Sequence, residues 1–177
     1  MVYRIPAVNL VGRGCLAQLK DEIGTLGCKK ALVVSDKFLT ENGVVEKVTK
    51  VLDQVGIEHT LYNDVKQNPS VANVEGGLEV LKKENCDFIV SIGGGSPQDC
   101  GKAISVLATN GGKITDYEGV NKSQKKCLPI VAIATTAGTS AEVTINYVIT
   151  DEETHIKMIM VDRNTLASIT VNDPELM

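Results

Sequence analysis

The chain has 177 residues, of which 43% are hydrophobic, and its formal net charge is -4 at pH 7. This length and composition predict one globular domain, large enough to bury its apolar residues without disulfides or a structural metal. The negative net charge argues against a nucleic-acid partner, and an aromatic content of 3% argues against a base-stacking surface.

The N-terminal segment has neither the basic start nor the unbroken apolar run of a signal peptide, and no segment approaches the roughly 20 apolar residues that span a bilayer. We therefore expect a cytoplasmic protein with no membrane partner. The cysteines are odd in number and have no CxxC spacing, which favours reduced structural thiols.

Amphipathic patterns and short apolar runs alternate from residue 16 to residue 134. Apolar residues at helical spacing predict helices over 16–26, 44–55, 71–81 and 100–107. Runs rich in β-branched residues predict strands over 31–34, 57–62, 88–92 and 129–134. Such alternation indicates right-handed βαβ crossovers, so the predicted fold class is α/β, with a Rossmann-like parallel sheet flanked by helices.

The C-terminal part of the chain has a different pattern. Segments 143–150, 156–161 and 168–171 read as strands, and no helix long enough to join parallel strands lies between them. We therefore expect some antiparallel strands near the C-terminal end, as an addition to the sheet or as a small β subregion.

A strand, three glycines and a helix follow one another in the segment FIVSIGGGSPQDCGKAIS, from Phe88 to Ser105. The glycines at 93–95 let the backbone approach an anion closely, and the N-terminal end of the next helix attracts negative charge. Ser96 and Pro97 suit the cap and first position of that helix, and Asp99 suits its first turn. The pattern predicts a phosphate-binding loop. The alternative is a plain turn followed by a well-capped helix, in which Asp99 has only a structural role.

Two common phosphate motifs do not fit this loop. A P-loop needs GxxxxGK[ST], whereas here five residues separate Gly95 from Gly101, and Ala103 stands where a hydroxyl is required. The Rossmann fingerprint GxGxxG fails at Gln98, and the loop follows a late strand. The remaining interpretation is a different dinucleotide or phosphate site, in which the start of the helix binds the anion in the same way.

Two other predicted strands end in polar loops. Asp36 follows 31–35, and a hydroxyl-rich loop at 135–140 follows 130–134. Ligands of parallel sheets gather outside the carboxyl ends of strands, so we expect these loops and the glycine loop to line one crevice. An acidic residue at such a place suits the two hydroxyls of a ribose, with a helix cap as the alternative role of Asp36.

Two of these segments carry a resemblance to a known family. GGGSPQDCGK at 93–102 resembles the GGGSxxDxAK signature of iron-dependent (group III) alcohol dehydrogenases, and TTAGTSAEVT at 135–144 resembles their second signature, TTAGTGSEVT. QNPS at 67–70 and INYVITDEE at 145–153 look most like the lactaldehyde reductase (1,2-propanediol oxidoreductase) branch. The departures, glycine at 101 for alanine and Ser-Ala at 140–141 for Gly-Ser, remove no expected cofactor contact.

The resemblance implies that residues 1–177 form an N-terminal dinucleotide-binding domain for NAD. It implies that Asp36 holds the adenosine ribose and disfavours a 2′-phosphate by charge repulsion, while Asn146 and Lys157 approach the nicotinamide half. A solvated strand face is the alternative for Lys157. The remaining cofactor residues that it implies are Asn68, Gly94, Gly95, Ser96, Pro97, Gln98, Asp99, Thr135, Thr136, Ala137, Gly138 and Thr139.

The same family holds Fe²⁺ or Zn²⁺ with one Asp and three His in an all-helical C-terminal domain. This chain has only His59 and His155, which are far apart and lack the HxxxH spacing of a helical metal site. We therefore expect that this domain and its metal ligands lie outside the chain, that the chain holds no catalytic residue, and that it binds NAD without turnover. An apolar face left uncovered would favour a homo-oligomer.

The function implied by the resemblance is hydride transfer between NAD and a small alcohol or aldehyde, such as 1,2-propanediol or lactaldehyde. A non-catalytic nucleotide-binding or interaction module is the alternative. A lyase related to dehydroquinate synthase shares the broad architecture, but the Ser-Pro loop and the TTAGT segment match the dehydrogenases better.

Overall fold

A computed structural model describes residues 4–177 of the chain. Its main sheet has six strands in the order β1-β9-β6-β4-β2-β3, and every neighbouring pair is parallel. The strands are β1 (Val8–Val11), β2 (Lys30–Val34), β3 (Glu58–Tyr62), β4 (Phe88–Gly93), β6 (Ile130–Ala134) and β9 (Ile169–Asn172). The predicted α/β class with a parallel sheet is confirmed.

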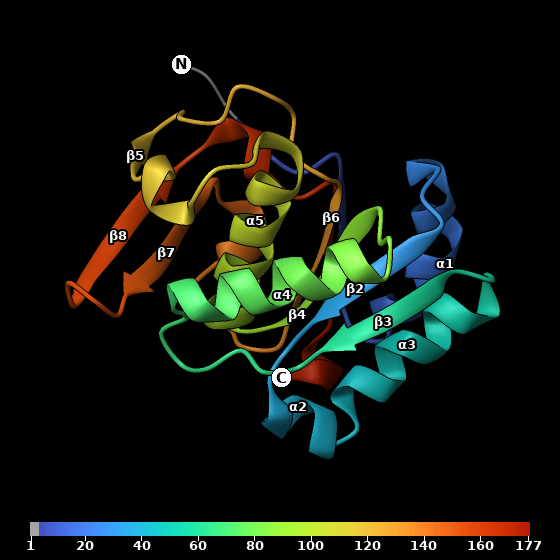
Figure 1. Cartoon of the computed structure of the whole chain (residues 1–177). Helices are drawn as coiled ribbons and strands as arrows, with labels where there is room; N and C mark the ends of the chain where they lie inside the picture. Colours follow the sequence, from blue (N-terminus) through green and yellow to red (C-terminus); the bar gives the residue numbers. More distant parts are fainter. Residues whose placement is uncertain (1–3) are drawn as a thin grey trace.

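Helices cover both faces of this sheet (Figure 1). The helices α4 (Val71–Lys83) and α5 (Gly95–Asn110) pack on one face, and α1 (Leu19–Glu22) and α3 (Val44–Gln54) on the other, while α2 (Lys37–Glu41) follows β2. A hydrophobic core lies on each face of the sheet. Along β2, Leu32 and Val34 belong to the core under α4 and α5, whereas Ala31 and Val33 belong to the core under α1 and α3. Because both faces are buried, the central strands read as continuous apolar runs.

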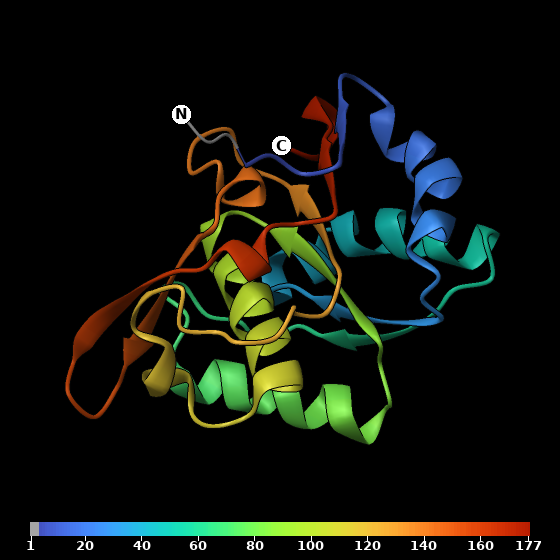
Figure 2. The same cartoon turned by 90° about the horizontal axis from the view of Figure 1, so that it is seen from above.

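A small second sheet consists of β5 (Gly119–Val120), β8 (Ile156–Val161) and β7 (Asn146–Asp151). The strands β7 and β8 form an antiparallel hairpin that projects from one side of the molecule (Figure 2). The expectation of antiparallel strands near the C-terminal end is confirmed for this hairpin. It is wrong for 168–171, because β9 returns to the main sheet and pairs in parallel with β1 and β6, where its apolar side chains are buried.

Some local predictions differ from the structure. The segment 16–26 is not one helix, because single turns of 3-10 helix at Cys15–Gln18 and Ile23–Leu26 flank the one-turn α1, and Gly27 ends the run with φ 66°. The edge strand β1 was not expected, since it has only four residues, of which only Leu10 is buried. Other short 3-10 helices are Ile114–Tyr117, Ala141–Val143, Arg163–Thr165 and Pro174–Leu176.

The cysteines Cys15, Cys28, Cys86, Cys100 and Cys127 are all free, and all but Cys28 are buried. Burial raises the pKa of each thiol, most strongly for Cys100, and raises the pKa of Cys127 to about 12. This agrees with the expected structural role. Within residues 4–177, no helix combines the length and the apolar character that a membrane span needs.

Tyr147 provides a test of the packing between the small sheet and α5. Its side chain is 1% exposed, and its hydroxyl has no hydrogen-bond partner among residues 4–177. We expect Tyr147→Phe to leave the free energy of unfolding unchanged or to raise it by about 1 kcal/mol, because it removes an unpaired buried polar group. Urea unfolding measures this change. Tyr62→Phe is the matched control, which should lose about 1 kcal/mol with the 2.8 Å bond to Asn73 O. A larger loss for Tyr147→Phe than for Tyr62→Phe would contradict the prediction.

Candidate functional site

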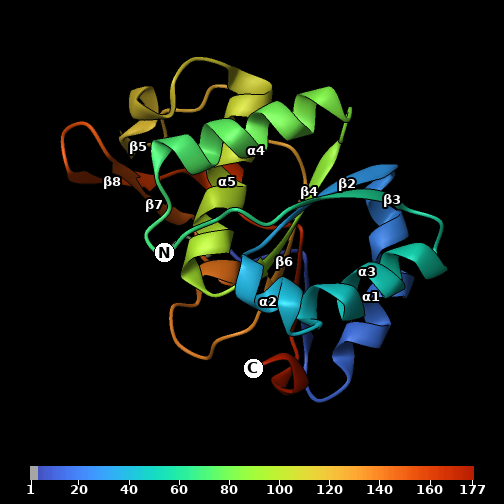
Figure 3. The same ribbon diagram turned by 60° about the horizontal axis from the view of Figure 1, so that its bottom comes forward.

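Three loops lie at the carboxyl edge of the main sheet. The sequence predicted that they line one crevice, but the hollow described below is lined by the loops after β2 and β4 and not by residues 135–140. The three loops follow β2, β4 and β6, which are neighbours in the sheet (Figure 3). A methyl group added to Gly94 would lie 2.9 Å from Thr136 Oγ1, and one added to Gly95 would lie 3.3 Å from Thr139 Cγ2. The glycine loop therefore packs directly against the threonine loop, and a side chain at either glycine would enter the space between them.

A hollow of about 270 Å³ opens beside these loops. It is lined by the loop after β2, the loop after β3 and the start of α5, through Asp36, Phe38, Val65, Lys66, Gln67, Gly94, Gly95, Ser96 and Pro97. A larger hollow, of about 340 Å³, lies between α4 and the turn of the β7–β8 hairpin. Its carboxylates Glu75, Asp151, Glu152 and Glu153 would repel a phosphate, so we place the candidate site at the first hollow.

The start of α5 differs from the prediction. The helix begins at Gly95 with Gly94 as its N-cap, so the expected roles of Ser96 as cap and Pro97 as first helical residue are wrong. Gly93 has φ 151°, and the helix starts two residues earlier than it would with Ser96 as its cap. Glycine at the cap offers no side-chain acceptor to the first N–H groups of the helix. These donors, together with the positive end of the helix dipole, therefore suit an anionic ligand.

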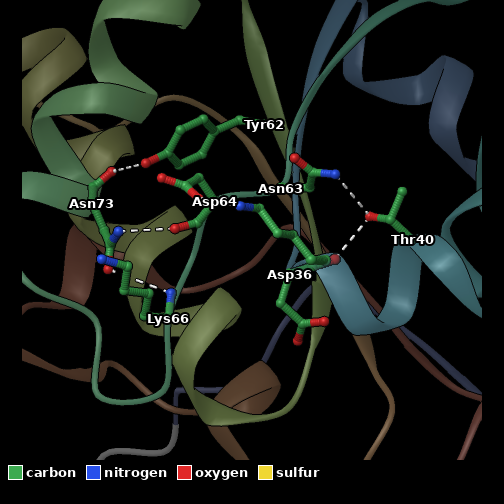
Figure 4. Close-up of polar contacts among 8 residues, drawn as sticks. Asp36, Thr40, Tyr62, Asn63, Asp64, Lys66 and Asn73 are labelled. Carbon is green, nitrogen blue, oxygen red and sulfur yellow. Dashed lines mark hydrogen bonds and ion pairs between the residues drawn. The ribbon is translucent and has the colours of Figure 1, made fainter.

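Asp36 caps α2 and also lines the hollow. Its Oδ1 accepts a hydrogen bond from Leu39 N at 2.8 Å, so the helix-cap role is present in the structure. The second oxygen, Oδ2, makes no hydrogen bond to the part of the chain that is described. Thr40 Oγ1 donates to Asp36 O at 2.8 Å and accepts from Asn63 Nδ2 at 3.3 Å, while the carboxylate points away from both residues (Figure 4). One carboxylate oxygen is thus left to bind a ligand.

Asn73 fixes the loop after β3, which forms another wall of the hollow (Figure 4). Its Nδ2 donates to Asp64 O at 2.9 Å, and its Oδ1 accepts from Ser70 N at 3.2 Å and from Lys66 N at 3.4 Å. Our reading of the sequence assigned no role to Asn73. The sequence pattern that could have indicated a role for Asn73 is the capping box that it forms with Ser70 at the start of α4.

Asn68 and Lys157 are in contact although 89 residues separate them in sequence, because Lys157 Nζ donates to Asn68 Oδ1 at 2.9 Å. Asn68 has φ 56°, and both side chains are exposed. Asn146, by contrast, lies at the other end of the hairpin ladder, paired with Val161, whereas Lys157 pairs with Thr150. The structure therefore joins Lys157 to Asn68 but does not bring it beside Asn146.

Gln98 and Asp99 are turned away from the hollow. Gln98 is 1% exposed, its Nε2 donates to Ile133 O at 2.9 Å, and its Oε1 accepts from Ser91 Oγ, so it joins α5 to β4 and β6. Asp99 Oδ2 accepts from Val148 N at 3.1 Å. Burial raises the pKa of Asp99 to about 6, although that hydrogen bond and the charge of Lys102 oppose the shift. Roles for Gln98 and Asp99 as cofactor ligands stay predictions.

The threonine loop has a buried base and an exposed tip. Thr135 is buried and its N–H donates to Gly93 O at 3.2 Å, which continues the pairing of β4 and β6. Residues 136–140, which include Ala137 and Gly138, are exposed. Thr139 Oγ1 accepts from Ala141 N at 3.4 Å. The tip is therefore free to contact a ligand that lies against the glycine loop.

The described residues do not suit a metal ion. Within residues 4–177, no three His, Cys, Asp or Glu side chains lie close enough together to bind one. His59 lies 3.6 Å from Asp53, and His155 lies in the hairpin turn with φ 59°. No chemical step through a metal is therefore assigned to these residues.

Comparison with known proteins points to one family. The family described as iron-containing alcohol dehydrogenase matches residues 6–174. Alcohol dehydrogenase 4 of Schizosaccharomyces pombe is 51% identical, over 99% of this chain and 42% of its own length. Lactaldehyde reductase of Escherichia coli K12 is 44% identical, over 94% of this chain and 44% of its own length.

Solved structures give the same result. A 1,3-propanediol oxidoreductase matches with a TM-score of 0.96 and 43% identity, over 99% of this chain and 46% of its own. Sulfoacetaldehyde reductase of Bifidobacterium kashiwanohense, in complex with NAD⁺, matches with a TM-score of 0.88 and 32% identity, over 99% of this chain and 46% of its own. The chain thus spans less than half the length of these relatives.

Proposed function

This chain belongs to the iron-containing alcohol dehydrogenase family, and we propose that it forms the NAD-binding part of such an enzyme. The observation that carries the proposal is the meeting of three features at one sheet edge. These features are a helix start capped only by glycine, a threonine loop packed against it, and an aspartate with one free carboxylate oxygen. Together they match the anionic, ribose-bearing part of a dinucleotide.

In the proposed complex, the pyrophosphate lies at the start of α5, where Gly94 and Gly95 leave room for it. Asp36 Oδ2 accepts hydrogen bonds from the adenosine ribose at the hollow. That hollow, of about 270 Å³, is smaller than a whole dinucleotide, so the remainder extends past the threonine tip. Bound NAD supplies the acceptor for the hydride that an alcohol releases on oxidation.

The nicotinamide half is assigned to the edge next to the small sheet. Asn146 is exposed at the start of β7, and the Lys157 ammonium donates a hydrogen bond to Asn68 within the QNPS segment. Since the hairpin register separates Asn146 from Lys157, we assign the two residues to different parts of this half. Thr135, Thr136 and the loop that follows form the opposite side.

The chemistry of the whole enzyme is proposed from the family. We propose a short alcohol or aldehyde, such as 1,2-propanediol or lactaldehyde, as substrate. Residues 1–177 form the dinucleotide domain, and the metal ligands and most of the substrate pocket come from residues beyond it. The 177-residue chain then binds NAD(H) without turning over alcohol.

A titration of the 177-residue chain with NADH, followed by NADH fluorescence, tests this function. We expect saturable binding, and no absorbance change at the nicotinamide band when NAD, 1,2-propanediol and Fe²⁺ or Zn²⁺ are added together. Absence of binding at millimolar NADH would refute the NAD site and favour a non-catalytic interaction module. Turnover by this chain would refute the placement of the metal ligands outside it.

Asp36 should determine the preference for NADH over NADPH. We expect Asp36→Asn to raise the affinity for NADPH relative to NADH by about tenfold, because it removes the charge that repels a 2′-phosphate. Asparagine keeps the cap of α2, whereas Asp36→Ala should relax the preference similarly and also lose about 1 kcal/mol of stability. Parallel titrations with both nucleotides measure the ratio of affinities, and an unchanged ratio in Asp36→Asn would rule out this role.

A further inference from the structure

Lys102 is a buried lysine with an unusual environment. It lies on α5 and is 1% exposed. Its Nζ donates to the backbone carbonyl oxygens of Ala141 at 2.6 Å, Thr144 at 2.8 Å and Asn146 at 2.8 Å. Among the described residues, no carboxylate oxygen lies within 4.0 Å of this nitrogen, so Lys102 forms no ion pair with them. The ammonium group is therefore held by a cage of main-chain carbonyls within one short segment.

A buried charge of this kind does not serve core stability alone. Burial lowers the pKa of Lys102 to about 8, although the charges of Asp99 and Glu142 favour the protonated form. A methionine would fill a similar volume without the cost of burying a charge. It could not, however, supply the donors that an ammonium offers to three converging carbonyl groups.

The segment that supplies these carbonyl groups, residues 141–146, directly follows the threonine loop. Thr139 lies beside Gly95 of the glycine loop, and its Oγ1 accepts from the N–H of Ala141, the first residue of this segment. Asn146, the last residue of the segment, opens β7. Lys102 thus links α5, whose start lines the hollow, to the segment that follows the threonine loop.

We propose that Lys102 is a positioning residue, which fixes residues 139–146 against α5 and thereby sets the position of the threonine loop against the glycine loop. It touches no ligand itself. The identity of the ligand rests on the proposed function, but the positioning role does not.

The test uses the 177-residue chain and the variant Lys102→Met. We expect its dissociation constant for NADH to rise by about tenfold or more. Hydrogen exchange, followed by mass spectrometry without nucleotide, should be faster in residues 139–148 and unchanged in β2 and β4. Lys83→Met, which replaces an exposed lysine of α4, is the control and should change neither measurement.

Chemical rescue separates the carbonyl cage from mere packing. Lys102→Ala lacks three methylene groups and the ammonium, which n-propylammonium can replace. We expect this ion to restore NADH affinity and slow exchange in Lys102→Ala, and tetramethylammonium, which has no N–H donor, to restore neither. If Lys102→Met does not fold, Lys102→Ala prepared with n-propylammonium provides the same comparison when the amine is removed.

Unchanged exchange in residues 139–148 of Lys102→Met would overturn the positioning role. NADH binding within twofold of the unsubstituted chain would show that the NAD site does not depend on Lys102, and would also overturn the positioning role while leaving the NAD site intact. Failure of the unsubstituted chain to bind NADH would instead refute the proposed function, and the exchange and rescue measurements would still decide the role of Lys102.

Discussion

Gly93→Ala should lower the free energy of unfolding by about 3 kcal/mol, although it adds only one methyl group. The new methyl would lie 2.5 Å from Pro97 Cγ and 3.0 Å from Pro97 Cβ, and the proline ring cannot rotate away. The φ of 151° at this position is also one that alanine rarely adopts. Urea unfolding measures the loss, and the binding of NADH should weaken with it because the same turn starts α5.

The matched control is Gly24→Ala, because a methyl group there has no neighbour within 4 Å and the backbone φ is not positive. We expect this variant to change the free energy of unfolding by less than about 0.5 kcal/mol. Equal stability of the Gly93→Ala and Gly24→Ala variants would show that the glycine loop is not constrained as the structure indicates.

The Asp99→Asn variant should gain stability relative to the unsubstituted chain as pH rises from about 4 to about 7. The difference in the free energy of unfolding should change by up to about 3 kcal/mol over this range. The pKa of Asp99 is raised from 3.8 to about 6 in the folded chain. Between these values the folded state binds more protons than the unfolded state. The stability that protonated Asp99 contributes is therefore fully present below about pH 4 and is lost as pH rises through about 6. Asparagine does not titrate and keeps an oxygen that can accept from Val148 N.

Urea unfolding of both chains at pH 4, 5, 6 and 7 measures this difference. Asp151→Asn is the control of opposite sign, because hydrogen bonds from Thr154 and Glu153 lower the pKa of Asp151. That carboxylate contributes stability above its unfolded pKa and loses it as pH falls, so the Asp151→Asn variant should not gain relative stability as pH rises. A difference for Asp99→Asn that does not vary with pH would contradict the buried, proton-binding state of Asp99.

The position of Gly101 shows how far a local reading of the sequence reaches. From sequence, glycine in place of the family's alanine should only weaken the helix slightly. In the structure, a methyl group there would lie 3.1 Å from Ser91 Cβ and 3.4 Å from Ile89 Cγ2, so Gly101 lets α5 approach β4 closely. The substitution thus has a packing reason that depends on a neighbour ten residues away in sequence.

For the candidate site too, some features could be predicted from the sequence and others could not. Asp36, the glycine triplet and the threonine loop could be predicted because each directly follows an apolar strand, and the carboxyl ends of parallel strands share one edge. The orientation of Gln98 and Asp99 could not be predicted, because both side chains bond to strands or hairpin residues that the chain reaches much later. The contact of Asn68 with Lys157 depends likewise on where the hairpin packs.

The sequence by itself determined the α/β class, the alternation of helices and strands, the glycine loop and the resemblance to a family, because periodicity and short motifs are properties of neighbouring residues. Only the tertiary structure decided that β9 returns to the main sheet between β1 and β6, that α5 starts at Gly95, and that Lys102 lies inside a carbonyl cage. The physical reason is that the place of β9 and the surroundings of Lys102 are fixed by burial and by pairing between residues 38 or more positions apart. No local pattern encodes such partners.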